Sequence, residues 1–413
     1  MISEKKLFKI YLILSVYIIS TAITLGAIGS YLDNETLLKL HPYIFFIGFG
    51  NLSILILNRY LTNSIYPQLK ITPKTKILYI INILIAVILI SLAVIFKIPM
   101  LKTTVGVMLM ISSSHAIYEI FKSLSIAEIW KDISARYYIF DVIFLLNAAL
   151  GLFVLGLKEQ FPDFSLIPFF ITESSYFLGS SFPLSISTMG FIYSYSIQDN
   201  KKGMVRKFFD YWFYIFVGGV LLFLVLILMD LYLGMMLSSN ILIAGVLIIF
   251  LIILKFLVKF YKKKFKHPTF LFLLSGVSLL LLTGVFGVMN IYYLQGREYG
   301  TRLAEINIWI YKSHTHAALL GWITLSFIGM IYAIYPTIQK NNSTKELQEG
   351  FKKILSDKQL KLGFIQLFVA VSMIIVIEIG FYYNNAITLL ISGLILSSSV
   401  SFTIINLVKG KKY

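Results

Sequence analysis

Residues 77–96 have the sequence ILYIINILIAVILISLAVIF, without a single charged side chain. A helix of that length is ~30 Å long, which matches the hydrocarbon core of a bilayer. Similar runs recur along the 413 residues, of which 58% are hydrophobic and only 13% charged. In soluble domains, about a quarter of the residues are charged. The sequence therefore predicts an all-α polytopic membrane protein.

The apolar runs predict about twelve transmembrane helices in a single transmembrane domain over residues 1–413. Segments of ~10 residues with alternating polarity, typical of membrane barrels, are absent. Residues 1–9 lead into an apolar run without a small-residue cleavage site, so the first helix is expected to be retained. Pro183 is expected to bend the long sixth segment, unless an outer turn precedes it. The predicted helices cover residues 7–30, 37–61, 76–97, 102–123, 136–157, 166–198, 208–233, 238–260, 268–294, 304–337, 360–382 and 386–408.

Positive charge is distributed unequally between the loops. If loops alternate between two sides, one side collects 29 of the 36 lysines and arginines. The positive-inside rule then predicts an even number of spans in the cytoplasmic (inner) membrane, with both termini cytoplasmic. The net charge of +17 faces anionic headgroups in this arrangement and requires no nucleic-acid partner. The remaining basic residues are Lys39, Lys97, Lys102, Lys158, Arg297 and Arg302 on the other side and Lys312 within a span.

The chain contains no cysteine. This excludes disulfides, iron–sulfur clusters, thiolate ligands and covalently attached c-type heme, all of which need cysteine sulfur.

Two histidines, His314 and His316, lie in the tenth predicted span, within IWIYKSHTHAALLGWITLSFIGMIYAIYP. Side chains at i and i+2 of a helix point ~200° apart. One helix can therefore offer imidazoles to two different neighbours, which suits two cofactors but not one metal ion. The alternative is that one histidine forms a hydrogen bond across the bundle and the other has no role.

His41 begins the second predicted span, LKLHPYIFFIGFGNLSILIL. The second and tenth spans run in the same direction, from outside to inside. At ~1.5 Å per residue, His314 and His316 lie roughly 12–18 Å below the start of their span, and His41 lies roughly 5–8 Å into its own. His41 and His316 could thus serve as facing ligands of one heme. Small residues nearby permit close approach of helices or of a flat macrocycle; these are Gly48, Gly50, Ala317, Ala318 and Gly321.

Two further histidines have simpler interpretations. His115 shares a helix face with Glu119, one turn away. The pair could be a third ligand site, a proton-carrying couple or a buried polar contact, of which the last is favoured. His267 precedes Pro268 in a basic loop and is expected to be a solvated residue at a helix start.

The tenth span resembles the H-x-H helix of subunit I in the heme–copper oxidase superfamily, closest to the cbb-type oxidases and nitric oxide reductases. The matching run is H-T-H-A-A-L-L-G-W, followed by F-I-G-M-I-Y and a closing Pro336. The second span, H-P-Y-I-F-F-I-G-F-G-N, is similar to the segment that carries a low-spin heme ligand in that subunit. The resemblance implies that His41 and His316 are axial ligands of a low-spin heme and that His314 is the proximal ligand of a second, high-spin heme. Both would be noncovalent, b-type hemes.

The chain departs from that family at its reaction centre. The family holds copper or nonheme iron with three more histidines on the sixth and seventh spans, yet no histidine lies between His115 and His267 here. Serine and tyrosine are poor substitutes for imidazole as copper ligands. Copper is therefore not expected, and neither is four-electron oxygen reduction; His115 is only a weak candidate as a further metal ligand.

Basic residues near the tenth span could pair with heme propionates. Lys312 lies one turn before His316 on the same face, and Arg297 and Arg302 lie in the loop before that span. Interfacial snorkelling explains each of them equally well. The resemblance also implies a cytochrome c subunit or a quinol as electron donor, beside the lipid bilayer.

Three functions remain open from the sequence. The first is a membrane heme protein for electron transfer or for binding of NO or O2, similar also to nitric-oxide-response membrane proteins, although the WHAH-type signature of that group is missing. The second is an active oxidoreductase, a terminal oxidase or nitric oxide reductase whose second metal has unusual ligands. The third is a secondary transporter without heme; its coupling groups would be Asp141, Glu173, Asp210, Asp230 and Glu378.

Overall fold

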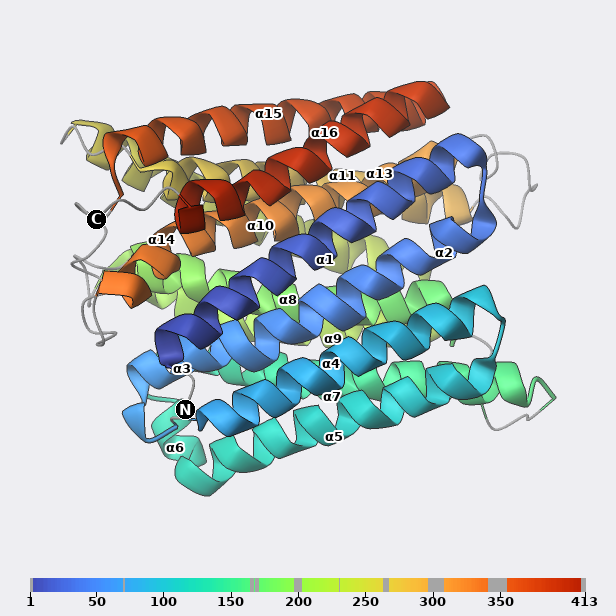
Figure 1. Ribbon diagram of the computed structural model, residues 1–413, viewed down its shortest axis with the longest axis horizontal. Helices are drawn as coiled ribbons and strands as arrows, with labels where there is room; N and C mark the ends of the chain where they lie inside the picture. The colour runs from blue at the N-terminus through green and yellow to red at the C-terminus, as the bar shows by residue number, and fades with distance from the viewer. Residues whose placement is uncertain are drawn as a thin grey trace. The chain divides into compact units, whose positions relative to one another are not determined.

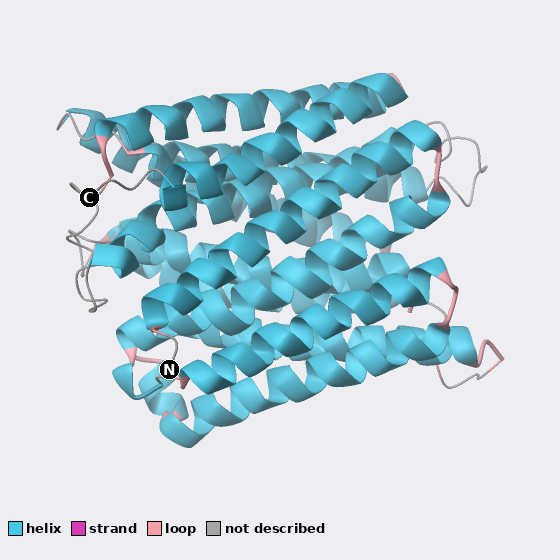
Figure 2. Cartoon of the chain, viewed as in Figure 1, coloured by secondary structure: helices cyan, strands magenta, loops and turns pink. Residues whose placement is uncertain are grey.

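The computed structural model describes residues 3–69, 71–163, 167, 171–196, 203–229, 231–262, 267–295, 308–340 and 355–409. These ranges are almost entirely helical and contain no strand (Figures 1 and 2). Within them, eleven helices are long and apolar enough to cross a membrane. The predicted fold class, an all-helical polytopic membrane protein, is thereby confirmed.

By its internal contacts the chain divides into two compact units. Unit 1 comprises Met1–Phe191, Thr337–Leu347 and Val400–Tyr413, and unit 2 comprises Ile192–Pro336 and Gln348–Ser399. A single functional domain over residues 1–413 stays a prediction.

The helices of unit 1 are α1 (Glu4–Leu32), α2 (Glu35–Tyr43), the π-helices η1 (Ile44–Gly50) and η2 (Ser53–Asn58), α3 (Arg59–Ile65), the short 3-10 turn η3 (Pro67–Leu69), α4 (Pro73–Ile95), α5 (Pro99–Ser123), α6 (Ile126–Ile129), α7 (Ile133–Gln160), most of α8 (Glu173–Ser196) and the π-helix η8 (Ile405–Lys409). Those of unit 2 are α9 (Met204–Leu228), α10 (Tyr232–Lys262), α11 (Pro268–Gln295), α13 (Ile308–His316), the π-helix η5 (Ala317–Thr324), most of α14 (Leu325–Lys340), α15 (Asp357–Tyr382) and most of α16 (Ala386–Ile404).

Eleven of the twelve predicted spans correspond to these long apolar helices. The exception is the sixth segment, predicted over 166–198. Helix α8 begins only at Glu173 and is rich in serine, so it is less apolar than the others. Residues 171 and 172 precede it without helical structure, which favours an outer turn over a longer helix. Pro336 lies inside the tenth helix, as the predicted span 304–337 has it, and α14 continues to Lys340.

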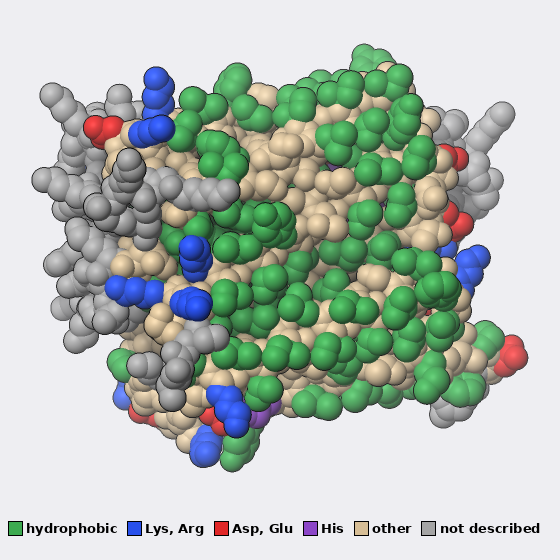
Figure 3. All heavy atoms as spheres, viewed as in Figure 1, with side chains coloured by type: hydrophobic (Ala, Val, Ile, Leu, Met, Phe, Trp, Pro, Cys, Tyr) green, Lys and Arg blue, Asp and Glu red, His purple; other side chains and the backbone are tan. Residues whose placement is uncertain are grey.

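Helix α4 shows how these helices meet lipid. Its exposed large side chains repeat at the spacing of one helix face: Leu78, Ile81, Ile85, Ile88, Leu92 and Ile95. A contiguous apolar stripe of this length is unfavourable in water and favourable in a bilayer. Figure 3 shows such hydrophobic side chains along the exposed helix faces, with charged side chains nearer to helix ends.

Two helices of unit 1 pack at very short range. A methyl group added at Gly106 of α5 would lie 2.6 Å from the backbone of Phe153 on α7. One added at Gly156 of α7 would lie 2.5 Å from the backbone nitrogen of Thr103. Glycine at both positions allows the backbones to touch, which is how membrane helices associate without a hydrophobic driving force.

Polar contacts define one end of unit 1. The carboxylate of Glu4, at the start of α1, pairs with the amine of Lys76 at the start of α4. Next to it, the hydroxyl of Tyr66 donates to the backbone oxygen of Glu128 on α6, at 2.6 Å. The loops after α3 and α5 therefore share one end with the start of α1, as alternation predicts.

A second polar group defines the opposite end of unit 1. Lys102 of α5 is buried and lies 2.7 Å from a carboxylate oxygen of Glu159 and 3.0 Å from one of Glu173. The hydroxyl of Tyr43 donates to Glu173 at 2.9 Å. This network ties α2, α5, α7 and α8 together. Which end faces the cytoplasm stays a prediction.

Candidate functional site

Each of the three candidate heme ligands lies next to a π-helix. His316 is the last residue of α13, and η5 starts at Ala317. His41 lies three residues before η1, which starts at Ile44. A π-helix is wider than an α-helix, is rare and frequently occurs at functional sites. The sequence contains no sign of these two segments, since their residues are ordinary apolar helix formers.

The imidazole of His314 is held by the backbone of α11. Its Nδ1 lies 2.9 Å from the carbonyl oxygen of Thr283. A carbonyl oxygen can only accept a hydrogen bond, so Nδ1 carries the proton. In a neutral imidazole the lone pair then resides on Nε2, which is the tautomer that a metal-ligating histidine needs.

His316 has the same tautomer through a different partner. Its Nδ1 lies 2.8 Å from the carbonyl oxygen of Lys312, one turn earlier on the same helix. Its ring packs against the ring of Phe381 on α15, with centroids 4.6 Å apart. Here too the lone pair resides on Nε2.

The two imidazoles contact different neighbouring helices. His314 faces α11, where a methyl group added at Gly287 would lie 3.0 Å from the ring atom Cε1. His316 faces α15 through Phe381. Within unit 2, the i, i+2 spacing therefore directs the two imidazoles to different helices, as predicted. Sequence reasoning did not find Thr283, Gly287 or Phe381, because nothing in their own surroundings marks them as partners of a histidine.

His41 belongs to unit 1 and packs flat against α1. A methyl group added at Gly26 would lie 3.2 Å from Cδ2 and 3.6 Å from Nε2 of the ring. His41 is the seventh residue counted from Glu35, the first of α2. His314 is likewise the seventh counted from Ile308, the first of α13. Each of the two thus lies about 9 Å from the first described residue of its helix. The start predicted for the tenth span, residue 304, lies outside the described residues, so the depth predicted for His314 stays a prediction.

Three of the small residues proposed from the sequence lie at close helix contacts, which is one of the two parts proposed for them. A methyl group at Gly48 would lie 2.7 Å from Ile18, and one at Gly321 would lie 2.6 Å from Leu279. One at Gly50 would meet Leu184 at 3.6 Å. The glycines that contact candidate ligands are Gly26 and Gly287.

The candidate propionate partners are only partly described. Lys312 is half-buried on α13, and its carbonyl oxygen is the acceptor for His316. Arg297 and Arg302 lie outside the described residues.

His115 pairs with a different residue from the one expected. Its Nδ1 lies 2.7 Å from the hydroxyl of Tyr79 on α4, and the ring is exposed rather than buried. A buried contact with Glu119 was the favoured interpretation, and the exposure of the ring contradicts it. Tyr79 faces α5 from the neighbouring helix, which the sequence of α5 alone does not show.

His267 lies at a helix start, as predicted, but is not solvated. It is 7% exposed, and its Nδ1 accepts a hydrogen bond from the backbone nitrogen of Thr269 at 3.4 Å. Burial lowers the pKa of His267 from 6.5 to about 4, because the charged form loses its hydration. The imidazole therefore caps α11 in the neutral form.

Acidic residues proposed for a transporter have distinct environments. Asp141 is fully buried within α7. Glu173 belongs to the Lys102 network. Both carboxylate oxygens of Glu378, on α15, are buried without a hydrogen-bond partner among the described residues. Asp210 is half-buried near the start of α9, and Asp230 lies outside the described residues.

Within the described ranges, no three or more histidine, aspartate or glutamate side chains gather closely enough to hold a metal ion. No protein-family model matches the chain, and no curated protein has a similar sequence.

Proposed function

We propose that the chain is a b-type heme protein of the cytoplasmic membrane, related to heme–copper oxidase subunit I. His41 and His316 are the axial ligands of a low-spin heme, and His314 is the ligand of a second heme. Both termini are cytoplasmic in this proposal. The electron donor is a quinol or a cytochrome c subunit.

The observation that carries the proposal is the tautomer of His314 and His316. Each Nδ1 donates to a backbone carbonyl oxygen, at 2.9 Å and 2.8 Å respectively. In metal sites, a histidine ligand nearly always donates its other ring N–H to a carbonyl or carboxylate, which fixes the ring and raises its basicity. Two neighbouring histidines with this arrangement, directed to different helices, favour two separate iron ligands over two isolated polar contacts.

The environment of His314 supports the same proposal. Gly287 lies one turn after Thr283 on α11, so both are on one helix face. Because Gly287 has no side chain, the ring can lie close enough to reach the carbonyl oxygen of Thr283. Gly26 plays the equivalent part for the flat contact of His41 with α1.

A bound heme would supply electron transfer and the binding of a diatomic gas. The residues of this chain would contribute the ligands, a dry apolar surrounding and the orientation of the imidazoles. A heme with His314 as its sole protein ligand would leave one side accessible to NO or O2. Copper is not part of the proposal.

Substitution of each histidine tests the assignment of ligands. In His41→Ala and His316→Ala, we expect loss of the low-spin absorption and electron paramagnetic resonance signals. In His314→Ala, the low-spin signals should persist while the high-spin signal and binding of carbon monoxide disappear. His115→Ala is the matched control, with both signals retained.

Other results would favour the alternatives. If His314→Ala removed the low-spin signal while His316→Ala preserved it, the ligand assignment would be wrong. Metal analysis that finds one copper or nonheme iron per chain would support an oxidase or reductase with unusual ligands. A heme-free, folded protein would favour a secondary transporter.

A further inference from the structure

Two charged residues are buried inside unit 1 without an ion pair. Arg59, the first residue of α3, is 1% exposed, and none of its three guanidinium nitrogens has a hydrogen-bond partner among the described residues. Asp141 of α7 is fully buried, and its Oδ1 has none either. Within the described ranges no ion pair joins the two. Buried polar groups of native proteins are nearly always satisfied, by protein or by water.

Asp141 has a single side-chain donor. The amide Nδ2 of Asn58 donates to the hydroxyl of Ser187 at 2.5 Å, and that hydroxyl donates to Oδ2 of Asp141 at 2.5 Å. One neutral donor is little compensation for the hydration that a carboxylate loses on full burial. Asp141 is therefore a buried carboxyl group with few hydrogen-bond donors among the described residues.

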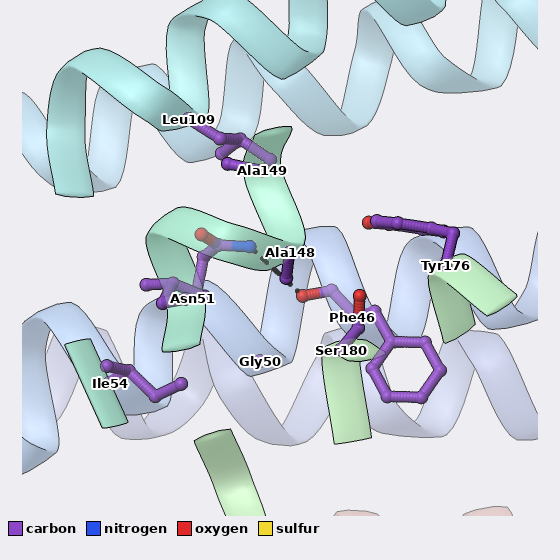
Figure 4. A pocket seen from close by; sticks show the side chains of 10 residues that line it. Phe46, Gly50, Asn51, Ile54, Leu109, Ala148, Ala149, Tyr176 and Ser180 are labelled. Atoms are coloured by element: carbon purple, nitrogen blue, oxygen red, sulfur yellow. Dashed lines mark hydrogen bonds between the residues drawn. The ribbon is translucent and has the colours of Figure 1, made fainter. Parts of the chain in front are cut away.

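Unit 1 also contains a small cavity, which Figure 4 shows with its lining side chains. Asn51 lines it, and the side-chain Nδ2 of Asn51 donates to the backbone oxygen of Phe46 at 3.1 Å. The Oδ1 of Asn51 is buried without a partner among the described residues. The cavity has room for about one water molecule. Most of its lining is apolar, and the polar groups that a water could contact belong to Asn51, Tyr176 and Ser180. Its lining residues are Phe46, Gly50, Asn51, Ile54, Leu109, Leu145, Ala148, Ala149, Tyr176 and Ser180.

The cavity lies on the same helix faces as the hydrogen bonds to Asp141. Leu145, which lines the cavity, is four residues after Asp141 on α7. Ser180, which also lines it, is seven residues before Ser187 on α8. Such spacings keep side chains on one face, about one or two turns apart, or ~5–11 Å. A water in the cavity would therefore lie about one or two helix turns from Asp141 and Ser187.

Toward the Lys102 end of unit 1, polar and aromatic side chains continue from the cavity. Tyr176 lines the cavity and stacks on Tyr43, with ring centroids 5.8 Å apart. The hydroxyl of Tyr43 donates to Glu173, whose side chain is 30% exposed. Stacked tyrosine rings and one hydrogen bond thus lie between the cavity and the partly exposed Glu173.

The guanidinium of Arg59, unpaired among the described residues, is a second reason to expect water in the interior of unit 1. Its guanidinium needs hydrogen-bond acceptors, and its electrostatic neighbours are Tyr79, Glu119 and Asp141. None of the three is a cation that would help Arg59 to hold an anion. Water is the remaining acceptor of suitable size.

We propose that Asp141 is a proton-exchanging carboxyl group in the membrane interior, served by internal water in the Asn51 cavity and around Arg59. The proton passes from the carboxyl oxygen of Asp141 to an adjacent water and returns by the same route, so no oxidant or reductant takes part. Asp141 would bind water and would exchange a proton with it. The inference is independent of heme binding.

Infrared difference spectroscopy of the purified full-length chain tests the proposal. The wild-type minus Asp141→Asn spectrum, recorded at neutral pH, should contain the carbonyl stretch of a protonated carboxyl group. Transfer to D2O should shift this band to lower wavenumber within minutes. Glu378→Gln is the matched control, because it removes another buried carboxyl group and should leave the Asp141 band unchanged.

A second variant, Ser187→Ala, tests the proposal if Asp141→Asn does not fold. Ser187→Ala removes the one side-chain donor to Asp141, so the same carbonyl band should move to higher wavenumber. A spectrum in which neither variant changes a protonated-carboxyl band would overturn the proposal. So would a band that stays unshifted after a day in D2O, because Asp141 would then be sealed from water.

Discussion

His314 and Thr283 are joined by a hydrogen bond between a side chain of α13 and the backbone of α11, with 2.9 Å between Nδ1 and the carbonyl oxygen. This contact fixes the tautomer of the imidazole and depends on the close approach that Gly287 allows. The orientation of the candidate heme ligand His314 therefore depends on the absence of a side chain at Gly287.

Gly287→Ala should weaken the binding of the second heme by His314. The added methyl group would lie 3.0–3.1 Å from the His314 ring, so the ring must shift by a few tenths of an ångström and its hydrogen bond to Thr283 is strained. We expect a reduced high-spin signal and weaker carbon monoxide binding, with the low-spin heme retained. Gly218→Ala is the control, because a methyl group there meets no atom within 4 Å. Equal effects of both substitutions on the high-spin signal would contradict the proposed part of Gly287.

Lys102→Met should destabilise the protein. Lys102 is the cation between Glu159 and Glu173, and its side chain is only 9% exposed. Without it, two partly buried carboxylates lie near each other, at a cost of roughly 1–3 kcal/mol, between that of exposed and buried pairs. The apparent melting temperature in detergent should fall.

Lys39→Met is the matched substitution for Lys102→Met. Lys39 pairs with Glu35 at 2.7 Å, but both side chains are largely exposed. We expect little or no change in melting temperature for it. If Lys102→Met and Lys39→Met had the same melting temperature, the Lys102 network would contribute nothing to stability.

Stability should decrease in mild acid because of His267. Its pKa is lowered to about 4 in the folded protein, whereas an unfolded histidine titrates near 6.5. Above pH 6.5 both states are neutral and His267 contributes no pH dependence. Between pH 6.5 and 4 the unfolded state binds the proton more readily, so stability falls by up to about 3 kcal/mol.

The variant His267→Gln isolates this effect. Glutamine retains an acceptor near the backbone nitrogen of Thr269 but does not titrate. Melting temperatures measured from pH 7.5 to 4.5 should fall less steeply for the variant than for the wild type. Parallel curves would show that His267 is not the group responsible.

Much of the fold could be predicted from the sequence, because hydrophobic runs bounded by charge determine where membrane helices lie. The span of α4 was expected at 76–97 and occurs at Pro73–Ile95. Helix α8 was harder to delimit, since serines lower its hydrophobicity. The π-helices η1 and η5 could not be predicted, since their residues are equally compatible with an α-helix.

The candidate site could be predicted only as a set of histidines. The spacing of His314 and His316 determines that they face different helices. Their partners, such as Thr283, are brought to them by tertiary packing, which leaves no local signal. The burial of His267 and the exposure of His115 were missed for the same reason, because burial depends on neighbouring helices.

The heme content of the purified wild-type protein tests the central claim most directly. The chain, expressed in heme-replete cells and purified in detergent, should be red and show a Soret band. Its pyridine hemochrome should identify b-type heme at two per chain, as three histidine ligands for one bis-histidine and one mono-histidine heme require. A folded, monodisperse preparation without heme would contradict the account.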